Sequence, residues 1–176
     1  MNEKNTFWES AGKAGLALGG VSILYMVITA LIGNGSSDAP SALLRLFSAL
    51  LWLAKLVGCI YLMRFFMLRF SNDNPSADNG RVFRFGMVVA LLSALLYSGV
   101  SLAYISFINP QMFEDAFAQL MDNPMFNDQM AAQMEDLIPR MPAISFYTNL
   151  IYCFLFGTIV SAVFSRNIPK RNPFEA

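Results

Sequence analysis

Residues 82–108 read VFRFGMVVALLSALLYSGVSLAYISFI, and this stretch decides the class of fold. Its only charged side chain is Arg84. At about 1.5 Å per residue, a helix of this length crosses the hydrocarbon core of a bilayer, which is roughly 30 Å thick. The stretch shows no alternation of apolar and polar residues, and backbone groups in lipid must be satisfied within a helix or a closed barrel. It therefore predicts a transmembrane helix.

Three further apolar blocks have the same character and cover residues 14–32, 42–66 and 144–164. The first and the last contain no charged side chain, whereas the middle one contains Arg45, Lys55 and Arg64. The first block is longer than the apolar region of a cleaved signal peptide, which has about 7–15 residues, so we interpret it as a span. The sequence thus predicts an all-α integral membrane protein, a bundle of four transmembrane helices in a single membrane domain.

The composition narrows the range of functions. Of the 176 residues, 56% are hydrophobic and 14% are charged, the mean hydropathy is +0.48, and the 12 basic side chains balance the 12 acidic ones. A disordered chain or a basic nucleic-acid binder needs far more charge, so no nucleic-acid partner is expected. The sequence has no histidine, the commonest general base and metal ligand. It shows no nucleotide, nucleophile-elbow or zinc motif, so we expect a protein that is not an enzyme and has no cofactor or metal.

The distribution of Lys and Arg predicts the orientation, because cytoplasmic loops carry the excess of both. Nine of the 12 fall on one side of the membrane: Lys4, Lys13, Arg64, Arg69, Arg81, Arg84, Arg166, Lys170 and Arg171. Arg45 and Arg140 fall on the other side, and Lys55 lies within a span. Both termini, including the tail 165–176, are therefore predicted to face the cytoplasm.

Residues 109–143 form an extracytoplasmic insert between the third and fourth spans. The pairs Asn109-Pro110 and Asn123-Pro124 each place a helix-capping residue before proline, which predicts amphipathic helices over 110–122 and 124–138. Pro139 and Pro142 are expected to end the second helix. The polar faces carry carboxylates, which disfavours attachment to anionic lipid. We interpret the apolar faces as a partner surface and not as a Cu(I) site. This surface comprises Phe113, Phe117, Met121, Phe126, Met130 and Met134.

Small residues recur at every fourth position of the spans, and such stripes let helix backbones approach closely in lipid. They are Ala11, Gly15 and Gly19 in the first span, Ala54 and Gly58 in the second, Gly86, Ala90, Ala94 and Ser98 in the third, and Cys153, Gly157 and Ser161 in the fourth. The pattern predicts a tight bundle. We interpret the two cysteines, Cys59 and Cys153, as small residues that face lipid or a neighbouring helix.

Lys55 is the unusual residue, because a cation in the middle of a span costs about 2.5–3.5 kcal/mol on insertion scales. No Asp or Glu lies within any predicted span. Its expected neighbours are the polar side chains of Tyr25, Tyr97, Ser98, Asn149 and Tyr152. Together with Lys55, two of them, Tyr97 and Asn149, form the candidate intramembrane site. Two interpretations remain open. Lys55 meets an anion, which is a ligand, a lipid phosphate or the carboxylate of another subunit, or it snorkels from a tilted or displaced helix to the membrane surface.

The chain resembles a bacterial family known as domain of unknown function 4199. The resemblance lies in the four-span layout, in NGRVFRFGMVVALLSAL at 79–95 after the basic end of the second span, and in NPMFNDQMAAQMED at 123–136. Its best local match is Gly80 with the following Phe85 and Gly86. The resemblance implies the inner membrane of Gram-negative bacteria and an accessory role in envelope assembly, and it assigns no functional residue.

Two hypotheses for function follow. The first is a scaffold or accessory subunit without enzymatic activity, which contacts membrane lipids and either another membrane protein or a second copy of itself. The second is a small transporter or lipid-handling protein that uses Lys55 to hold an anionic group.

Overall fold

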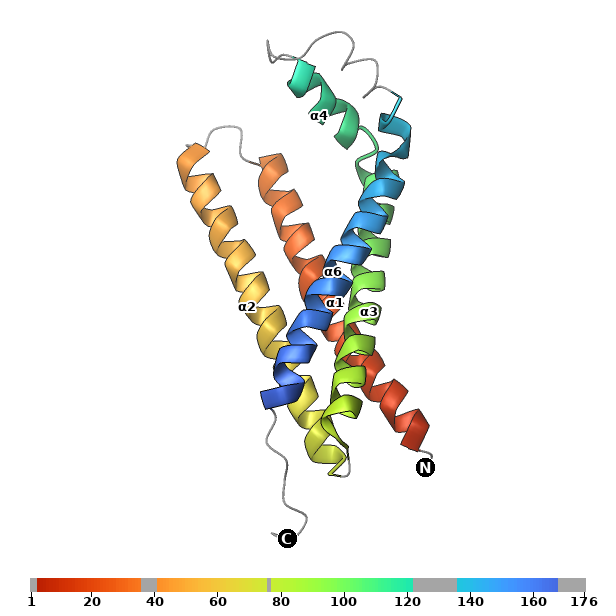
Figure 1. Cartoon of the computed structure of the whole chain (residues 1–176). Helices are drawn as coiled ribbons and strands as arrows, with labels where there is room; N and C mark the ends of the chain where they lie inside the picture. The colour runs from red at the N-terminus through yellow and green to blue at the C-terminus, as the bar shows by residue number, and fades with distance from the viewer. Residues whose placement is uncertain (1–2, 36–40, 76, 122–135, 168–176) are drawn as a thin grey trace.

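Long helices account for most of the computed structural model, which describes residues 3–35, 41–75, 77–121 and 136–167. Four of them run side by side along the molecule (Figure 1), namely α1 (Glu3–Gly35), α2 (Ser41–Asp73), α3 (Asn79–Ala103) and α6 (Met141–Asn167). Each is long and apolar enough to cross a membrane, and the described residues include no strand. The protein is therefore an all-α, multi-pass membrane protein, as predicted.

α1, α2 and α6 contain the predicted spans and extend beyond them at both ends, whereas the third span starts earlier than predicted and ends, as predicted, at Ile108. The start of α3 has a clear local cause, because the Asp78 side chain accepts a hydrogen bond of 2.9 Å from the backbone N–H of Arg81. At its other end α3 continues into a π-helical segment, η1 (Tyr104–Ile108), which ends immediately before Asn109-Pro110. Proline cannot continue the helical hydrogen bonding, so the chain leaves the bundle there.

The insert is only partly described. Its first helix, α4 (Met112–Met121), starts two residues later than predicted, because Pro110 lies in a turn. Most of the second predicted helix, residues 124–138, lies outside the described residues. The prediction that Pro139 and Pro142 end it is wrong at Pro142, which lies in the first turn of α6, while Pro139 belongs to a short 3-10 helix, η2 (Ile138–Arg140), directly before it. A first turn tolerates proline because its N–H groups have no helical acceptor.

Three of the four long helices pack closely. A Cβ added to Gly15 of α1 would lie 2.7 Å from Leu92 Cβ, and one added to Gly157 of α6 would lie 2.5 Å from Ala90 Cβ, both on α3. These small residues therefore allow contact with α3, as predicted. The prediction fails for α2, because Ala54 is exposed and nothing lies within 4 Å of a Cβ built on Gly58.

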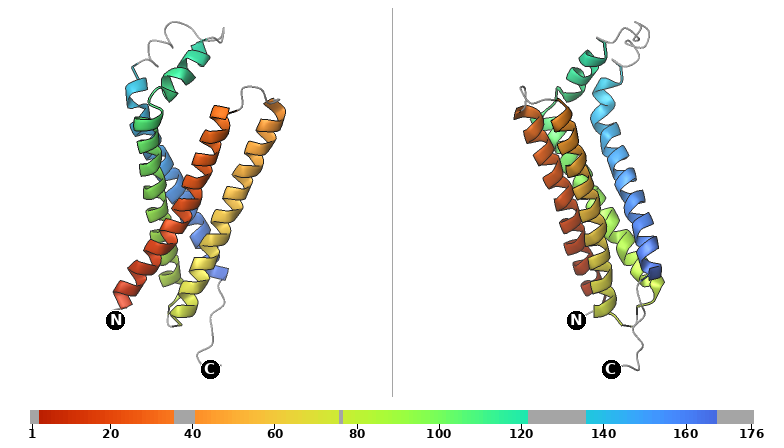
Figure 2. Two further views of the ribbon diagram at one scale, coloured as in Figure 1. Left: turned by 180° about the vertical axis from the view of Figure 1, so that it is seen from behind. Right: turned by 90° about the vertical axis from the view of Figure 1, so that its left-hand side faces the viewer.

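α2 is accordingly the least enclosed of the long helices. Buried residues make up 6% of its most apolar window, against 33% in α3. Figures 1 and 2 show that α1 and α2 converge with α3 and α6 at the end that holds both termini and diverge toward α4. At the converging end, the rings of Phe70 and Phe85 stack at 4.2 Å, and Phe7 packs edge-on against both. This aromatic cluster joins α1, α2 and α3 and closes one end of the bundle.

Candidate functional site

The ammonium group of Lys55 lies inside the bundle. Its Nζ is 4.9 Å from the ring centroid of Tyr25 on α1 and 4.8 Å from that of Tyr97 on α3. Lys55 is half-buried, and these contacts direct its side chain across the bundle and not along α2 to the membrane surface. The structure thus disfavours snorkelling.

The two rings account for the presence of a cation at this depth. Each cation–π contact contributes about 0.5–2 kcal/mol, so two together offset much of the insertion cost of about 2.5–3.5 kcal/mol. Aromatic rings carry no net charge, however, and the positive charge remains. Within the described part of the chain, no carboxylate forms an ion pair with Lys55. The site therefore retains an attraction for an anion.

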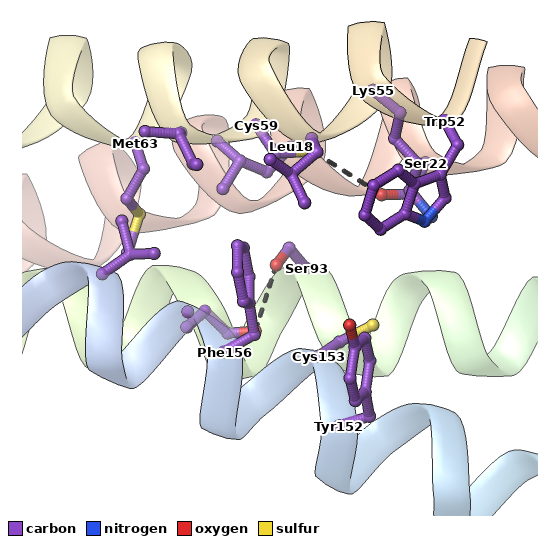
Figure 3. A pocket seen from close by; sticks show the side chains of 15 residues that line it. Leu18, Ser22, Trp52, Lys55, Cys59, Met63, Ser93, Tyr152, Cys153 and Phe156 are labelled. Carbon is purple, nitrogen blue, oxygen red and sulfur yellow. Dashed lines mark hydrogen bonds between the residues drawn. The ribbon is translucent and has the colours of Figure 1, made fainter. Parts of the chain in front are cut away.

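Lys55 also lines a partly open cavity of about 110 Å³ to which all four long helices contribute residues (Figure 3). A single water molecule needs about 10–15 Å³, so the cavity has room for a small ionic group. The lining residues of α2 recur at helical spacing and form one wall, and those of α6 do the same on the opposite wall. Residues of α1 and α3 form the floor. The lining consists of Trp52, Lys55, Leu56, Cys59, Ile60 and Met63 from α2, Tyr152, Cys153, Phe156, Gly157 and Val160 from α6, Leu18 and Ser22 from α1, and Ala90 and Ser93 from α3.

A few polar groups interrupt this apolar lining. The Ser22 hydroxyl lies 4.0 Å from the Cys59 sulfur, a weak contact that links α1 to α2. The Ser93 hydroxyl donates a 3.0 Å hydrogen bond to the carbonyl of Ala90 on its own helix. Both serines lie at the floor, and among the described residues that line the cavity Lys55 is the only charged one. The cavity is therefore apolar with one positive end, which suits a ligand with an apolar part and an anionic part.

The cavity opens sideways between α2 and α6. Trp52 and Tyr152 lie on opposite walls at the level of Lys55, and they are 49% and 63% exposed. In Figure 3 both rings extend from their helices into the space between the walls. Because both helices are membrane spans, this opening faces the lipid.

The structure brings only part of the predicted polar site together. Tyr97 and Tyr25 contact Lys55, and Tyr152 lines the same cavity. Asn149 is not in the lining, because its side-chain amide donates a 3.5 Å hydrogen bond to Ser101 on α3.

The predicted partner surface is described only in α4. There Phe113 and Phe117 are half-buried, and Met121 is 42% exposed. Figure 1 shows α4 beyond the ends of α1 and α2. Phe126, Met130 and Met134 lie outside the described residues.

Sequence reasoning missed Trp52 and treated the two cysteines as incidental. Both Cys59 and Cys153 are free thiols that line the cavity. Trp52 and Cys59 lie three residues before and four after Lys55, so the helical repeat already placed them on its face. No sequence signal indicated which face of α6 lies opposite.

Comparisons with known proteins give one finding. A family model described as "Protein of unknown function (DUF4199)" matches residues 13–166, which include all four long apolar blocks. No curated protein and no solved structure matches the chain.

Proposed function

We propose that this chain, which belongs to the DUF4199 family of proteins of unknown function, is a lipid-handling protein that binds an anionic amphiphile at Lys55. One observation carries this proposal: the charge of Lys55 is not neutralised by a described carboxylate, and it lines a cavity that opens to the lipid between α2 and α6. Coulomb attraction is strong where water is excluded, so Lys55 offsets the cost of dehydrating an anion at this place.

The apolar lining of the cavity and its opening between two membrane helices favour an amphiphile over a small aqueous ion as the ligand. Leu18, Leu56 and Val160 are among the apolar side chains that line most of the cavity, and the opening lies between two membrane helices. A hydrated ion would lose its water on this route without polar groups to replace it. The hydrocarbon chain of a molecule already dissolved in the bilayer can enter the cavity sideways without contact with water, and pairing with Lys55 offsets the cost of dehydrating its anionic group.

Binding without catalysis is part of the same proposal. The chain has no histidine, and one cation among hydroxyl and thiol groups offers no base for moving a proton. We further propose that the protein lies in a bacterial inner membrane with both termini in the cytoplasm. The excess of Lys and Arg at the end that holds both termini supports this orientation.

Native mass spectrometry of the protein released from detergent micelles tests the binding proposal. Wild-type protein should retain a stoichiometric adduct whose mass identifies an anionic lipid or fatty acid. Lys55→Gln should lose it, because the amide has no charge to pair with the ligand. Arg64→Gln is the matched control: it removes a cation from the same helix, and Arg64 is absent from the cavity lining and stands 6.0 Å from the Phe164 ring. If wild type and Lys55→Gln carry the same adducts, the proposal is wrong.

A second role, as an accessory subunit or scaffold in envelope assembly, is supported by α4. Its first turn carries Glu114 and Asp115, and its apolar side includes Phe113 and Phe117. The helix lies beyond the ends of α1 and α2, where a second protein could reach it (Figure 1).

Site-specific photocrosslinking tests this second role. A benzophenone amino acid at Phe117 should crosslink to one defined membrane protein or to a second copy of the chain. The same group at Val163, which is 52% exposed on α6, should crosslink to lipid alone. Lipid adducts at both positions would exclude a partner at α4.

A further inference from the structure

We infer that the ligand is a monoanionic amphiphile with a single hydrocarbon chain, of the long-chain fatty acid class. Its carboxylate lies at Lys55, and its chain follows the slot between α2 and α6 toward Met63 and Val160. This inference rests on the proposed function and specifies the number of chains, the charge and the direction of the ligand.

The shape of the cavity fits an extended chain. The residues that line it run from Trp52 to Met63 on α2 and from Tyr152 to Val160 on α6. At about 1.5 Å per residue these walls are about 16 Å and 12 Å long. Such a slot is about half the thickness of the hydrocarbon core, which is roughly 30 Å and accommodates two leaflets of acyl chains. Its length therefore matches the apolar part of one leaflet.

The small volume of the slot favours one chain over two. The cavity measures about 110 Å³ over this length, and both walls carry large side chains such as Phe156. Met63, which is 2% exposed, and the stacked rings of Phe70 and Phe85 close the end below it. A phospholipid would have to place one of its two chains outside the slot.

A single negative charge matches the only cation that the cavity offers. The other basic residues of α2 nearest to it, Arg45 and Arg64, are ten and nine residues away, which is about 14–15 Å along a helix. Phosphate groups are typically bound by several donors, often in the forked geometry of Arg. One ammonium group with the nearby Ser22 hydroxyl is a better match for a carboxylate.

The position of Lys55 sets the direction of the ligand. Lys55 lies at the end of the slot that Trp52 and Tyr152 mark, and Met63 lies at the other end. Cys59 follows one helical turn further in, and Met63 one turn beyond that. A carboxylate held at Lys55 therefore places the first part of its chain across Cys59.

Thiol protection in nanodiscs of zwitterionic phosphatidylcholine tests this arrangement. In a Cys153→Ser background, the rate of Cys59 alkylation by N-ethylmaleimide is measured with and without oleate. Oleate should slow the reaction at least tenfold and should do so at saturable concentrations. Lys55→Gln should abolish the protection, whereas Lys55→Arg, which keeps the charge, should retain it.

The matched control is Gly58→Cys in a chain without the two natural thiols. Gly58 neighbours Cys59 in the sequence but is absent from the residues that line the slot, and nothing lies within 4 Å of a Cβ built there. Oleate should leave its alkylation rate unchanged. Equal protection at both positions would mean a general effect on the bilayer and would overturn the inference.

The anionic two-chain lipid dioleoylphosphatidylglycerol separates this inference from the proposed function. If this lipid protects Cys59 through Lys55 and oleate does not, the single-chain inference is wrong and the proposed anion site stands. If neither protects in a manner that depends on Lys55, the proposed function itself is wrong.

Discussion

Helix α6 makes two unlike contacts with its neighbours, one with α3 and one with α2. Toward α3 it presents Gly157 and Ser161, which meet Ala90 and Gly86 at backbone distance. Toward α2 it presents the large side chains of Tyr152 and Phe156, which face Trp52, Lys55 and Met63 across the slot. The first contact is a closed seam and the second encloses space. In lipid, where burial of apolar surface gives helices little reason to associate, side-chain size decides which contact forms.

The two contacts also differ in how they treat polar groups. In the seam, the hydroxyl groups of Ser98 and Ser161 are buried without a hydrogen-bond partner among the described residues. These two serines therefore contribute to the seam by their small side chains, which allow close packing, and not by hydrogen bonds. At the slot, by contrast, the ammonium group of Lys55 contacts two tyrosine rings and forms no ion pair among the described residues. From this comparison we infer that the seam stabilises the bundle and that the slot is the place where a ligand binds.

The largest predicted effect is on the seam. Gly157→Val should destabilise the protein by about 1–3 kcal/mol. The added Cβ would lie 2.5 Å from Ala90 Cβ and 3.4 Å from Ala90 Cα, and these atoms cannot move away by rotation of a side chain. Reversible unfolding in mixed detergent micelles measures this change. Gly58→Val is the matched control on α2 and should change the stability by less than about 0.5 kcal/mol. Equal losses in both variants would contradict the distinction between the two contacts.

A smaller effect is expected where the slot meets the seam helix α3, at the contact between Lys55 and Tyr97. Tyr97→Leu should destabilise the protein by about 0.5–2 kcal/mol by removing one cation–π contact, whereas Tyr97→Phe, which keeps the ring, should have less effect. A double-mutant cycle with Lys55→Met isolates the pair. A coupling energy of zero would show that the ring packs near Lys55 without stabilising its charge.

The sequence predicted the spans well for a physical reason. A segment that crosses lipid must be a long apolar helix, so each block predicts its own span without information from the other blocks. The contact of Lys55 with Tyr97 could also be predicted, because a cation in a span needs polar or aromatic neighbours and the other spans offer few polar side chains.

Other features depended on how helices face one another. Ala54 and Gly58 form the same kind of stripe as Gly15 and Gly19, yet only the latter pair meets a partner. A stripe shows that close approach is permitted and leaves the partner unspecified. For the same reason Asn149 was placed beside Lys55, whereas it bonds to Ser101. The cavity itself arises from residues on four helices, and no local pattern encodes it.

The anion preference of the slot is the most direct test of the account. Equilibrium binding of oleate and of its uncharged analogue oleyl alcohol should be measured in nanodiscs with wild-type protein and with Lys55→Gln. We predict that wild-type protein prefers oleate at least tenfold, which corresponds to about 1.4 kcal/mol, and that the preference disappears in Lys55→Gln. The same ratio of affinities in both proteins would show that the charge of Lys55 does not select the ligand and would contradict the account.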